Sequence, residues 1–298
     1  MARTIGVVMT DRIVAGLVDD NQIVGQLRHF PENTKTKAGL VEIPSEQLSQ
    51  LICTLISELA KDAGELTAIG VAVPGIIRYG VIEDSPNLNQ LKGAKLTTTL
   101  SSALRARNIQ TPVSVFNDAD AVAAGIAAQR GHLDRLIHVW TIGNGIGFGR
   151  HPAAEGPWEG GHMVVTLDPK ENYCGCGGRG HLEGITGYRA MRRRFFDMEP
   201  DEIFESAKKG DVRCADFVHL WHRALAAATA TAIHLEGAGR FYFTGRNIRF
   251  LDEGLLKRYL DEMIMMSPLQ SYTVEILPED QETSIIGAGT GAALAQRA

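Results

Sequence analysis

The chain is poor in the features that mark several common classes of protein. Its 298 residues contain four cysteines, too few to hold a domain of this size together by disulfides. It has no run of 18 apolar residues, and its N-terminus lacks a basic segment followed by an apolar stretch and a cleavage site. Neither a membrane span nor a secretory signal is therefore predicted, and a cytoplasmic protein is expected.

Positive charge is also scarce. The net charge is −5, and the longest basic run is Arg192-Arg193-Arg194. Proteins that bind nucleic acid usually concentrate positive charge on one face, so no nucleic-acid partner is expected. The chain does have 44% hydrophobic residues, enough at this length for two domains that need neither disulfides nor a metal to fold.

The residue pattern predicts alternating strands and helices. Short β-branched runs separated by polar turns predict an antiparallel meander over the first thirty residues, and apolar residues at helical spacing predict a helix over 45–62. Further strands are expected at 66–73, 113–116, 136–142, 145–149, 163–167, 241–244 and 273–277, and helical stretches at 96–107, 118–129, 181–236, 250–265 and 283–297. The plan of a meander followed by alternating helices and strands occurs twice. It indicates a duplicated α/β architecture with a cleft between the halves.

One cluster of residues has the composition of a metal site. Cys174 and Cys176 lie one residue apart in a glycine-rich loop, with His181 after them and His162 twelve residues before Cys174. Two thiolates and two imidazoles are the ligands of a tetrahedral structural zinc, and this set leaves no position for a catalytic water. The alternative is two unpaired thiols and two ordinary surface histidines.

These residues also carry a family resemblance. Glu159-Gly160-Gly161-His162, followed by Cys174-Gly175-Cys176-Gly177-Gly178-Arg179-Gly180-His181-Leu182-Glu183, resembles the signature of the ROK family of repressors, open reading frames and sugar kinases, with His181 in place of a third cysteine. Other segments are similar in the same order: Val73-Pro74-Gly75 and Ser85-Pro86-Asn87-Leu88 to the sugar-side loops, Phe116-Asn117-Asp118-Ala119 to the catalytic segment, and Gly143-Asn144-Gly145-Ile146-Gly147 to the second phosphate loop.

The resemblance implies a two-domain, actin-like (ribonuclease H-like) α/β fold with an interdomain cleft. The smaller domain would comprise residues 1–116 plus 283–298, and the larger, residues 117–282, would carry the zinc loop. Asp118 would be the general base toward a hexose or hexose derivative. The residues expected to bind the sugar are Asn87, Asn117, Glu159, His162 and Glu183; those expected at the phosphoryl donor are Gly143, Asn144, Gly145, Gly147 and Gly245; and the zinc ligands are His162, Cys174, Cys176 and His181. ATP with magnesium is the implied donor, and a homodimer the implied assembly.

The nucleotide side departs from the family pattern. Family kinases begin with a loop of the form Asp-x-Gly-Gly-Thr, whereas this chain has residues 5–13 there with neither loop glycine nor its aspartate. Asp11 and Arg12 fit a two-residue hairpin turn instead. After the strand at 241–244, one glycine, Gly245, remains and is followed by Arg246.

Three hypotheses therefore stand. The first is a sugar kinase with Asp118 as base. The second is a sugar-binding sensor or regulatory protein without efficient phosphoryl transfer, and the third is a kinase that uses another phosphoryl donor. Family repressors carry a helix-turn-helix before the first strand, and this sequence starts at the strand, so direct DNA binding is not expected.

Overall fold

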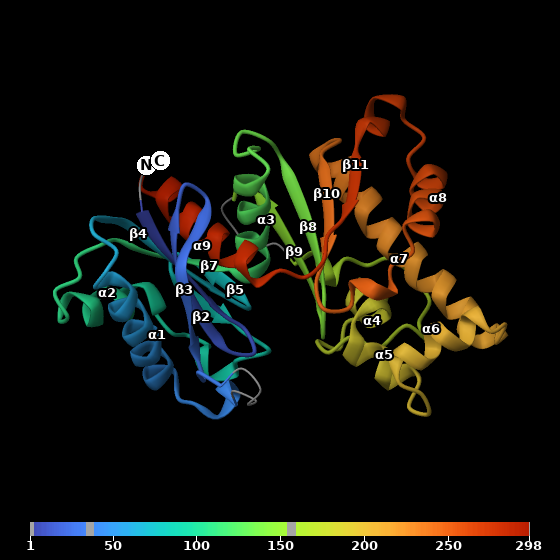
Figure 1. The fold of residues 1–298 in the computed structure, drawn as a ribbon. Coiled ribbons are helices and arrows are strands. Elements are labelled where there is room, and N and C mark those ends of the chain that lie inside the picture. The colour runs from blue at the N-terminus through green and yellow to red at the C-terminus, as the bar shows by residue number, and fades with distance from the viewer. Residues whose placement is uncertain (1–2, 34–38, 154–158, 298) are drawn as a thin grey trace. The chain divides into compact units, whose positions relative to one another are not determined.

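The computed structural model of this protein describes residues 3–33, 39–153 and 159–297 (Figure 1). The chain forms two compact units, one made of Met1–Leu136, Gly149–Trp158 and Asp280–Ala298, the other of Ile137–Phe148 and Glu159–Glu279. The sequence-based domain limits began the second domain at residue 117. In the structure, residues 117–136 lie in the first unit.

The first unit is built on a five-stranded mixed sheet. In spatial order its strands are β3 (Gln22–Phe30), β2 (Ile13–Asp19), β1 (Arg3–Met9), β4 (Leu66–Val73) and β7 (Val113–Asn117). The first three pair antiparallel, which confirms the predicted meander. β4 pairs parallel with β1 and with β7, as expected for strands that are joined through helices.

Helices cover both faces of this sheet. Side chains alternate along each strand, so neighbouring residues of β1 pack against different helices. On one face Ile5, Val7 and Met9 of β1 share a core with α1 (Ser45–Ala60) and α2 (Leu96–Arg105). On the other face Val8 shares a core with α3 (Asp118–Gln129) and α9 (Gln281–Ala295). Figure 1 shows α1 and α2 on the side of the sheet opposite to α9.

A small hairpin in the first unit was not predicted. After β4 the chain forms β5 (Ile76–Arg78) and β6 (Val81–Asp84), which pair antiparallel. Tyr79 and Gly80 form the turn between them, both with positive φ, at 50° and 72°. The hairpin is followed by η2 (Asn89–Leu91), and η1 (Leu40–Glu42) precedes α1.

The second unit has a four-stranded sheet with its own core. The strands, in spatial order, are β11 (Thr273–Ile276), β10 (Arg240–Thr244), β8 (Ile137–Ile142) and β9 (Ile146–His151). β8, β10 and β11 run parallel. Its largest fully buried side chains, Trp140, Trp221, Phe241 and Phe243, come from β8, β10 and the long helix α7 (Val212–Glu236).

The helical region predicted over 181–236 is correct in type but is divided into several helices. They are α4 (Leu182–Thr186), α5 (Tyr188–Arg194), α6 (Pro200–Lys208) and α7, and α8 (Glu253–Met263) follows later. Pro200 begins α6, and the Asp211 carboxylate accepts a hydrogen bond from Cys214 N at the start of α7. Proline at the first helical position and aspartate at the N-cap are typical helix-start signals.

The strand predicted over 163–167 is wrong. Val164 makes an isolated bridge to His181, and the exposed fractions of Val164 and Leu167 are 59% and 92%. Short 3-10 turns occur elsewhere in this unit: η3 (Gly160–His162), η4 (Ile248–Phe250) and η5 (Ser267–Ser271).

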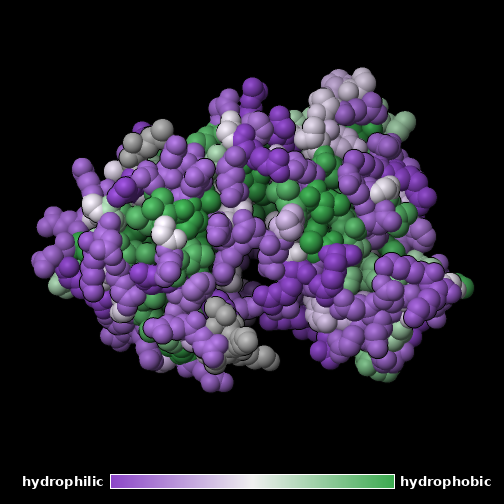
Figure 2. Space-filling view, viewed as in Figure 1, coloured by the Kyte–Doolittle hydropathy of each residue, from purple (hydrophilic) through white to green (hydrophobic). Residues whose placement is uncertain are grey.

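Among the residues that the structure describes, no helix is both long and apolar enough to cross a membrane. Figure 2 shows that hydrophilic residues cover most of the visible face of each unit.

Candidate functional site

The segment predicted to be catalytic lies where β7 ends and α3 begins. Asn117 is the N-cap of α3, and its Oδ1 accepts hydrogen bonds from Ala119 N at 2.8 Å and Asp120 N at 3.4 Å. Its Nδ2 donates to the carbonyl of Gly75 at 2.9 Å. The Asn117 amide thus caps the helix and ties it to the Pro-Gly turn after β4.

The hairpin of β5 and β6 returns the chain to the same turn. Ser85 is fully buried, and its hydroxyl donates to the carbonyl of Pro74 at 2.7 Å. Asn87, two residues further along, is exposed. The structure therefore brings together, within the first unit, three segments that the sequence singled out: residues 73–75, 85–88 and 116–119.

Asp118 is the first residue of α3 and is half-buried. Its Oδ1 accepts a hydrogen bond from Ala119 N at 3.0 Å. Burial raises the pKa of the Asp118 carboxyl above its ordinary value and outweighs the opposing effect of that hydrogen bond. A carboxylate with a raised pKa is a stronger proton acceptor once it is ionised.

Asp120 is a functional candidate that the sequence analysis missed. Its Oδ1 accepts a hydrogen bond from the backbone N–H of Arg150 at 2.9 Å. Burial, and to a smaller extent the negative charge of Asp118, raise the pKa of this carboxyl to about 6, against the opposing effect of the hydrogen bond from the Arg150 N–H. A second acid two residues after Asp118, in the first turn of the same helix, was the available signal.

The turn between β1 and β2 does not have the form of a phosphate loop. Met9 pairs with Ile13, which leaves three turn residues rather than the two expected, and Thr10 N donates to the Arg12 carbonyl at 3.1 Å. The glycine of this strand, Gly6, serves another purpose: a Cβ there would lie 1.9 Å from the Ile285 carbonyl oxygen of α9. Gly6 therefore lets the helix approach the sheet.

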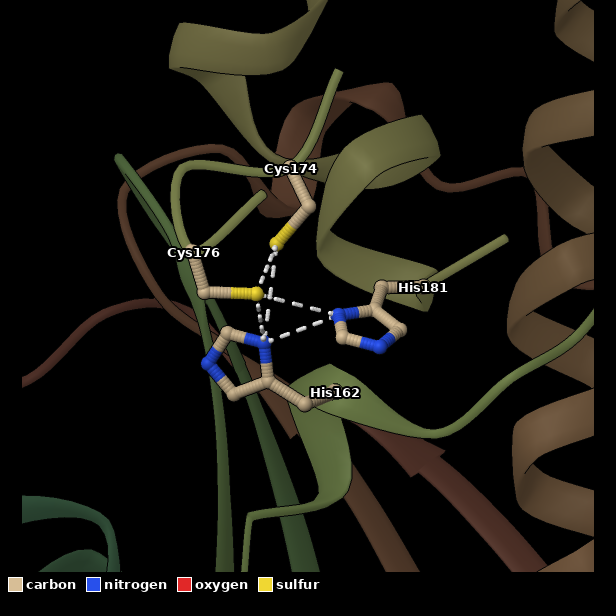
Figure 3. A group of neighbouring side chains, drawn as sticks. All are labelled: His162, Cys174, Cys176 and His181. Atoms are coloured by element: carbon tan, nitrogen blue, oxygen red, sulfur yellow. Dashed lines mark hydrogen bonds between the residues drawn. The ribbon is translucent and has the colours of Figure 1, made fainter. Parts of the chain in front are cut away.

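The four predicted zinc ligands converge in the second unit (Figure 3). Cys174 Sγ lies 3.4 Å from Cys176 Sγ, and both sulfurs lie 3.5 Å from His162 Nδ1. His181 Nδ1 lies 3.3 Å from Cys176 Sγ and 3.3 Å from His162 Nδ1. All four ligand atoms lie within 4.8 Å of one another.

These separations fit a tetrahedral metal site. Ligand atoms about 2.0–2.3 Å from a zinc ion at tetrahedral angles lie about 3.3–3.8 Å apart. Five of the six pairs in the cluster lie at 3.3–3.5 Å. Burial raises the pKa of the Cys174 thiol to about 12, and the charge of Glu183 contributes to the same effect, so a metal bound here at neutral pH would have to displace a proton from this group.

Two residues of the basic run support the stem of this loop. Arg194 pairs with the buried carboxylate of Glu171, and its guanidinium lies over the ring of Tyr173. Arg193 donates to the Tyr173 carbonyl at 3.0 Å. The basic side chains at the end of α5 therefore hold the segment that leads into Cys174.

The two acidic residues predicted to bind sugar, Glu159 and Glu183, each lie beside one ligand of the Cys-His cluster. The Glu159 side chain is exposed and its Oε2 lies 3.8 Å from His162 Nε2, the ring nitrogen opposite the cluster. Glu183 is half-buried, with Oε1 3.8 Å from Cys174 Sγ and Oε2 accepting from Ile146 N at 3.0 Å.

The residues predicted to contact the phosphoryl donor lie in two places in the second unit: at the turn between β8 and β9, and directly after β10. Gly143, Asn144 and Gly145 join β8 to β9, Gly143 N donates to the Gly145 carbonyl at 3.0 Å, and Gly147 lies within β9. Gly245, at the end of β10, has a φ of 107° and passes close to the backbone of Ile142, the last residue of β8.

Asn247, also missed by the sequence analysis, is 2% exposed, and its Nδ2 donates to the Gly143 carbonyl at 3.0 Å. The structure thus places Asn87, Asn117 and Asp118 in the first unit, and Glu159, His162, Glu183 and the glycine turn in the second.

Comparisons with known proteins agree with the resemblance. A glucokinase of Pyrobaculum calidifontis is 29% identical over 221 residues, which cover 67% of this chain and 72% of that protein. A ROK hexokinase from Thermus thermophilus superposes with a TM-score of 0.79 at 22% identity over 99% of both chains. A ROK family glucokinase from Streptomyces griseus, in complex with glucose and AMPPNP, superposes with a TM-score of 0.68 at 20% identity over 100% of both chains. A sequence model of the ROK family matches residues 5–296, so this chain belongs to the ROK family and has the α/β, actin-like fold of its sugar kinases.

Proposed function

We propose that this chain is a sugar kinase that transfers a phosphoryl group to a hydroxyl of a hexose or hexose derivative, with Asp118 as the general base. The similarity to a glucokinase over 67% of the chain supports the reaction class. The observation that carries the assignment is the half-buried Asp118 carboxylate, whose pKa is raised by burial, at a helix start fixed by the Asn117 cap.

The proposed step needs little covalent chemistry from the protein. The Asp118 carboxylate accepts the proton of the sugar hydroxyl as that oxygen attacks the terminal phosphorus of the donor, and the bond from this phosphorus to the donor's bridging oxygen breaks. A base of this kind contributes about 10²–10⁴ in rate, and the remainder comes from positioning and from stabilisation of phosphoryl charge.

The remaining polar residues would hold the sugar. The proposed sugar contacts are Asn87, Asn117, Glu159, His162 and Glu183, since each sugar hydroxyl can both donate and accept hydrogen bonds. A zinc ion held by His162, Cys174, Cys176 and His181 would supply fixed loop geometry, because four protein ligands leave no open position. His162 would then bind zinc through Nδ1 and face Glu159 or the sugar through Nε2.

The glycines of the second unit are the proposed contacts of the phosphoryl donor. The AMPPNP complex of the Streptomyces griseus glucokinase favours a nucleotide, which Gly143, Asn144, Gly145, Gly147 and Gly245 would contact. The three-residue turn at Thr10–Arg12 does not fit the loop that holds phosphate and magnesium in the family motif. We therefore assign no magnesium ligand.

A coupled assay tests this proposal. Glucose, N-acetylated hexosamines and other hexoses are offered with ATP and magnesium, and Asp118→Asn is expected to lower kcat at least about a hundredfold while sugar binding by calorimetry persists. Asp252→Asn is the matched control, because Asp252 caps α8 in the second unit and asparagine caps equally well. Equal turnover of Asp118→Asn and the unmodified chain would contradict the role of Asp118.

The short turn between β1 and β2 favours a second candidate, a sugar-binding protein that transfers phosphate poorly. The same assay separates the two. Sugar binding without Asp118-dependent product, from either ATP or inorganic polyphosphate, supports the binding protein. Turnover with polyphosphate alone supports a kinase with another donor.

A further inference from the structure

We infer that metal occupancy of the Cys-His cluster fixes the glycine turn between β8 and β9, and that Glu183 is the positioning residue that connects the two. The inference rests on the proposed function only for the metal; it does not require that phosphoryl transfer occurs. The segment that joins the two sites, residues 181–189, is called the connecting segment below.

The connecting segment begins at a ligand of the cluster. His181 contributes Nδ1 to the cluster and is the N-cap residue of α4. Its backbone is fixed by the bridge to Val164, and Leu182 N donates to the Met163 carbonyl at 2.9 Å. Met163 directly follows His162, a second ligand, so two of the four ligands determine where α4 starts.

Glu183 reaches from this start to the glycine turn. Its Oε2 accepts the hydrogen bond of Ile146 N at 3.0 Å, and Ile146 is the residue that follows Gly143, Asn144 and Gly145. The contact is close: a Cβ on Gly145 would lie 2.3 Å from Glu183 Oε2. The other oxygen of the same carboxylate lies 3.8 Å from Cys174 Sγ, so one side chain contacts both the cluster and the turn.

The far end of the connecting segment contacts the turn directly. Tyr188 N donates to the Gly143 carbonyl and Arg189 N to the Asn144 carbonyl, each at 3.2 Å. Gly187 N donates to the Glu183 carbonyl at 3.0 Å, which fixes the junction of α4 and α5. The connecting segment therefore supplies three hydrogen bonds to the turn and its following residue, and its first residue is a metal ligand.

Removal of the metal should loosen this arrangement. Without an ion, only thiol and imidazole hydrogen bonds join the four ligand atoms, so the loop and the start of α4 lose the stronger tether that a metal would give them. The Ile146 N–H would then lose its hydrogen bond to the Glu183 carboxylate more often and bond to water instead. A hydrogen bond to a charged group contributes enough that its loss corresponds to at least about a tenfold change in exchange rate.

Amide hydrogen exchange of the full chain, in chelator-treated protein and after zinc alone is returned, tests the inference. In the unmodified chain, metal removal is expected to speed exchange of the Ile146 amide at least about tenfold. In Glu183→Ala this amide should exchange fast with and without zinc, while Gly178, whose N–H donates to Cys176 Sγ, keeps its dependence on the metal. A general structural loss would affect both amides.

Two further variants complete the test. Glu183→Gln keeps a neutral acceptor and should retain a smaller metal effect at Ile146, and it serves in place of Glu183→Ala if that variant does not fold. Glu205→Gln changes an exposed glutamate of α6 that pairs with Lys208, and it should behave as the unmodified chain.

An unchanged Ile146 exchange rate in a chain that binds one zinc ion would overturn the inference, as would a persistent metal effect in Glu183→Ala. A chain that binds no zinc overturns both the inference and the proposed metal site, and metal analysis reveals this directly. Absence of kinase turnover leaves the exchange result intact.

Discussion

The carboxylate of Asp120 accepts a hydrogen bond from the backbone N–H of Arg150, with an N–O distance of 2.9 Å. Arg150 lies in β9, the strand within which the chain passes from the second unit to the first, between Phe148 and Gly149. The second residue after this passage is thus hydrogen-bonded to the first turn of α3, which also carries the proposed base, Asp118.

Replacement of Asp120 by asparagine is expected to stabilise the protein at neutral pH. The pKa of Asp120 is about 6 in the folded chain and 3.8 is its ordinary value, so the folded state binds more protons than the unfolded state between these pH values. The unmodified chain therefore loses stability as pH rises from about 4 to about 6, by at most about 3 kcal/mol, and then stays level. Asparagine carries no charge and still accepts from Arg150 N.

Urea unfolding at pH 4, 5, 6 and 7 measures this effect. The gain of Asp120→Asn over the unmodified chain should be absent at pH 4 and largest at pH 7. Asp216→Asn, in α7 of the second unit, controls for a general charge effect. A gain that does not vary with pH would show that Asp120 titrates normally.

Gly149→Ala should destabilise the protein, because β9 passes very close to α3. A Cβ at this position would lie 2.0 Å from the carbonyl oxygen of Ala119. Backbone cannot move as a flexible side chain can, so a cost of about 3 kcal/mol in the free energy of unfolding is expected. Gly254→Ala, in α8, is the matched control: the nearest atom is a carboxylate oxygen of Asp252 at 3.2 Å. Comparable unfolding free energies for the two variants would be inconsistent with the close approach.

Cys176→Ser should remove the metal. Serine is a poor zinc ligand, so metal analysis of protein purified without chelator should fall from about one zinc ion per chain to about a tenth or less, and thermal unfolding should occur several degrees lower. Cys214→Ala is the control, because Cys214 is a buried free cysteine of α7 and is not one of the four residues of the Cys-His cluster. Retention of zinc by Cys176→Ser would mean that the ion is held elsewhere.

The fall of kcat/KM at low pH, the acid limb of the pH profile, should follow the protonation of Asp118. The proposed base acts only when ionised, and burial raises its pKa, so the fall of kcat/KM with decreasing pH should begin at a higher pH than it would with an ordinary aspartate. Asp120→Asn removes a neighbouring negative charge and should shift this limb to lower pH. An acid limb that stays in place in Asp120→Asn would argue against electrostatic coupling of the two carboxyls.

Patterns local in sequence predicted much of the molecule. Short β-branched runs separated by polar turns identified β1, β2 and β3, because strand pairing across short turns requires little beyond local conformation. The spacing of Cys174, Cys176 and His181, with His162 twelve residues before Cys174, predicted the cluster for a similar reason: these ligands are close enough in sequence to meet around one ion. The motif residues also carried the family assignment across residues 5–296.

Only the tertiary structure decided how these parts are supported. Asn117 bonds to Gly75, 42 residues away, Asp120 to Arg150, 30 residues away, and Glu183 to Ile146, 37 residues away. Gly6, to which the sequence pattern gave no role, admits α9 from the other end of the chain. A hydrogen bond between residues this far apart depends on strand register and helix packing, and these are set by the whole core rather than by any local run of residues.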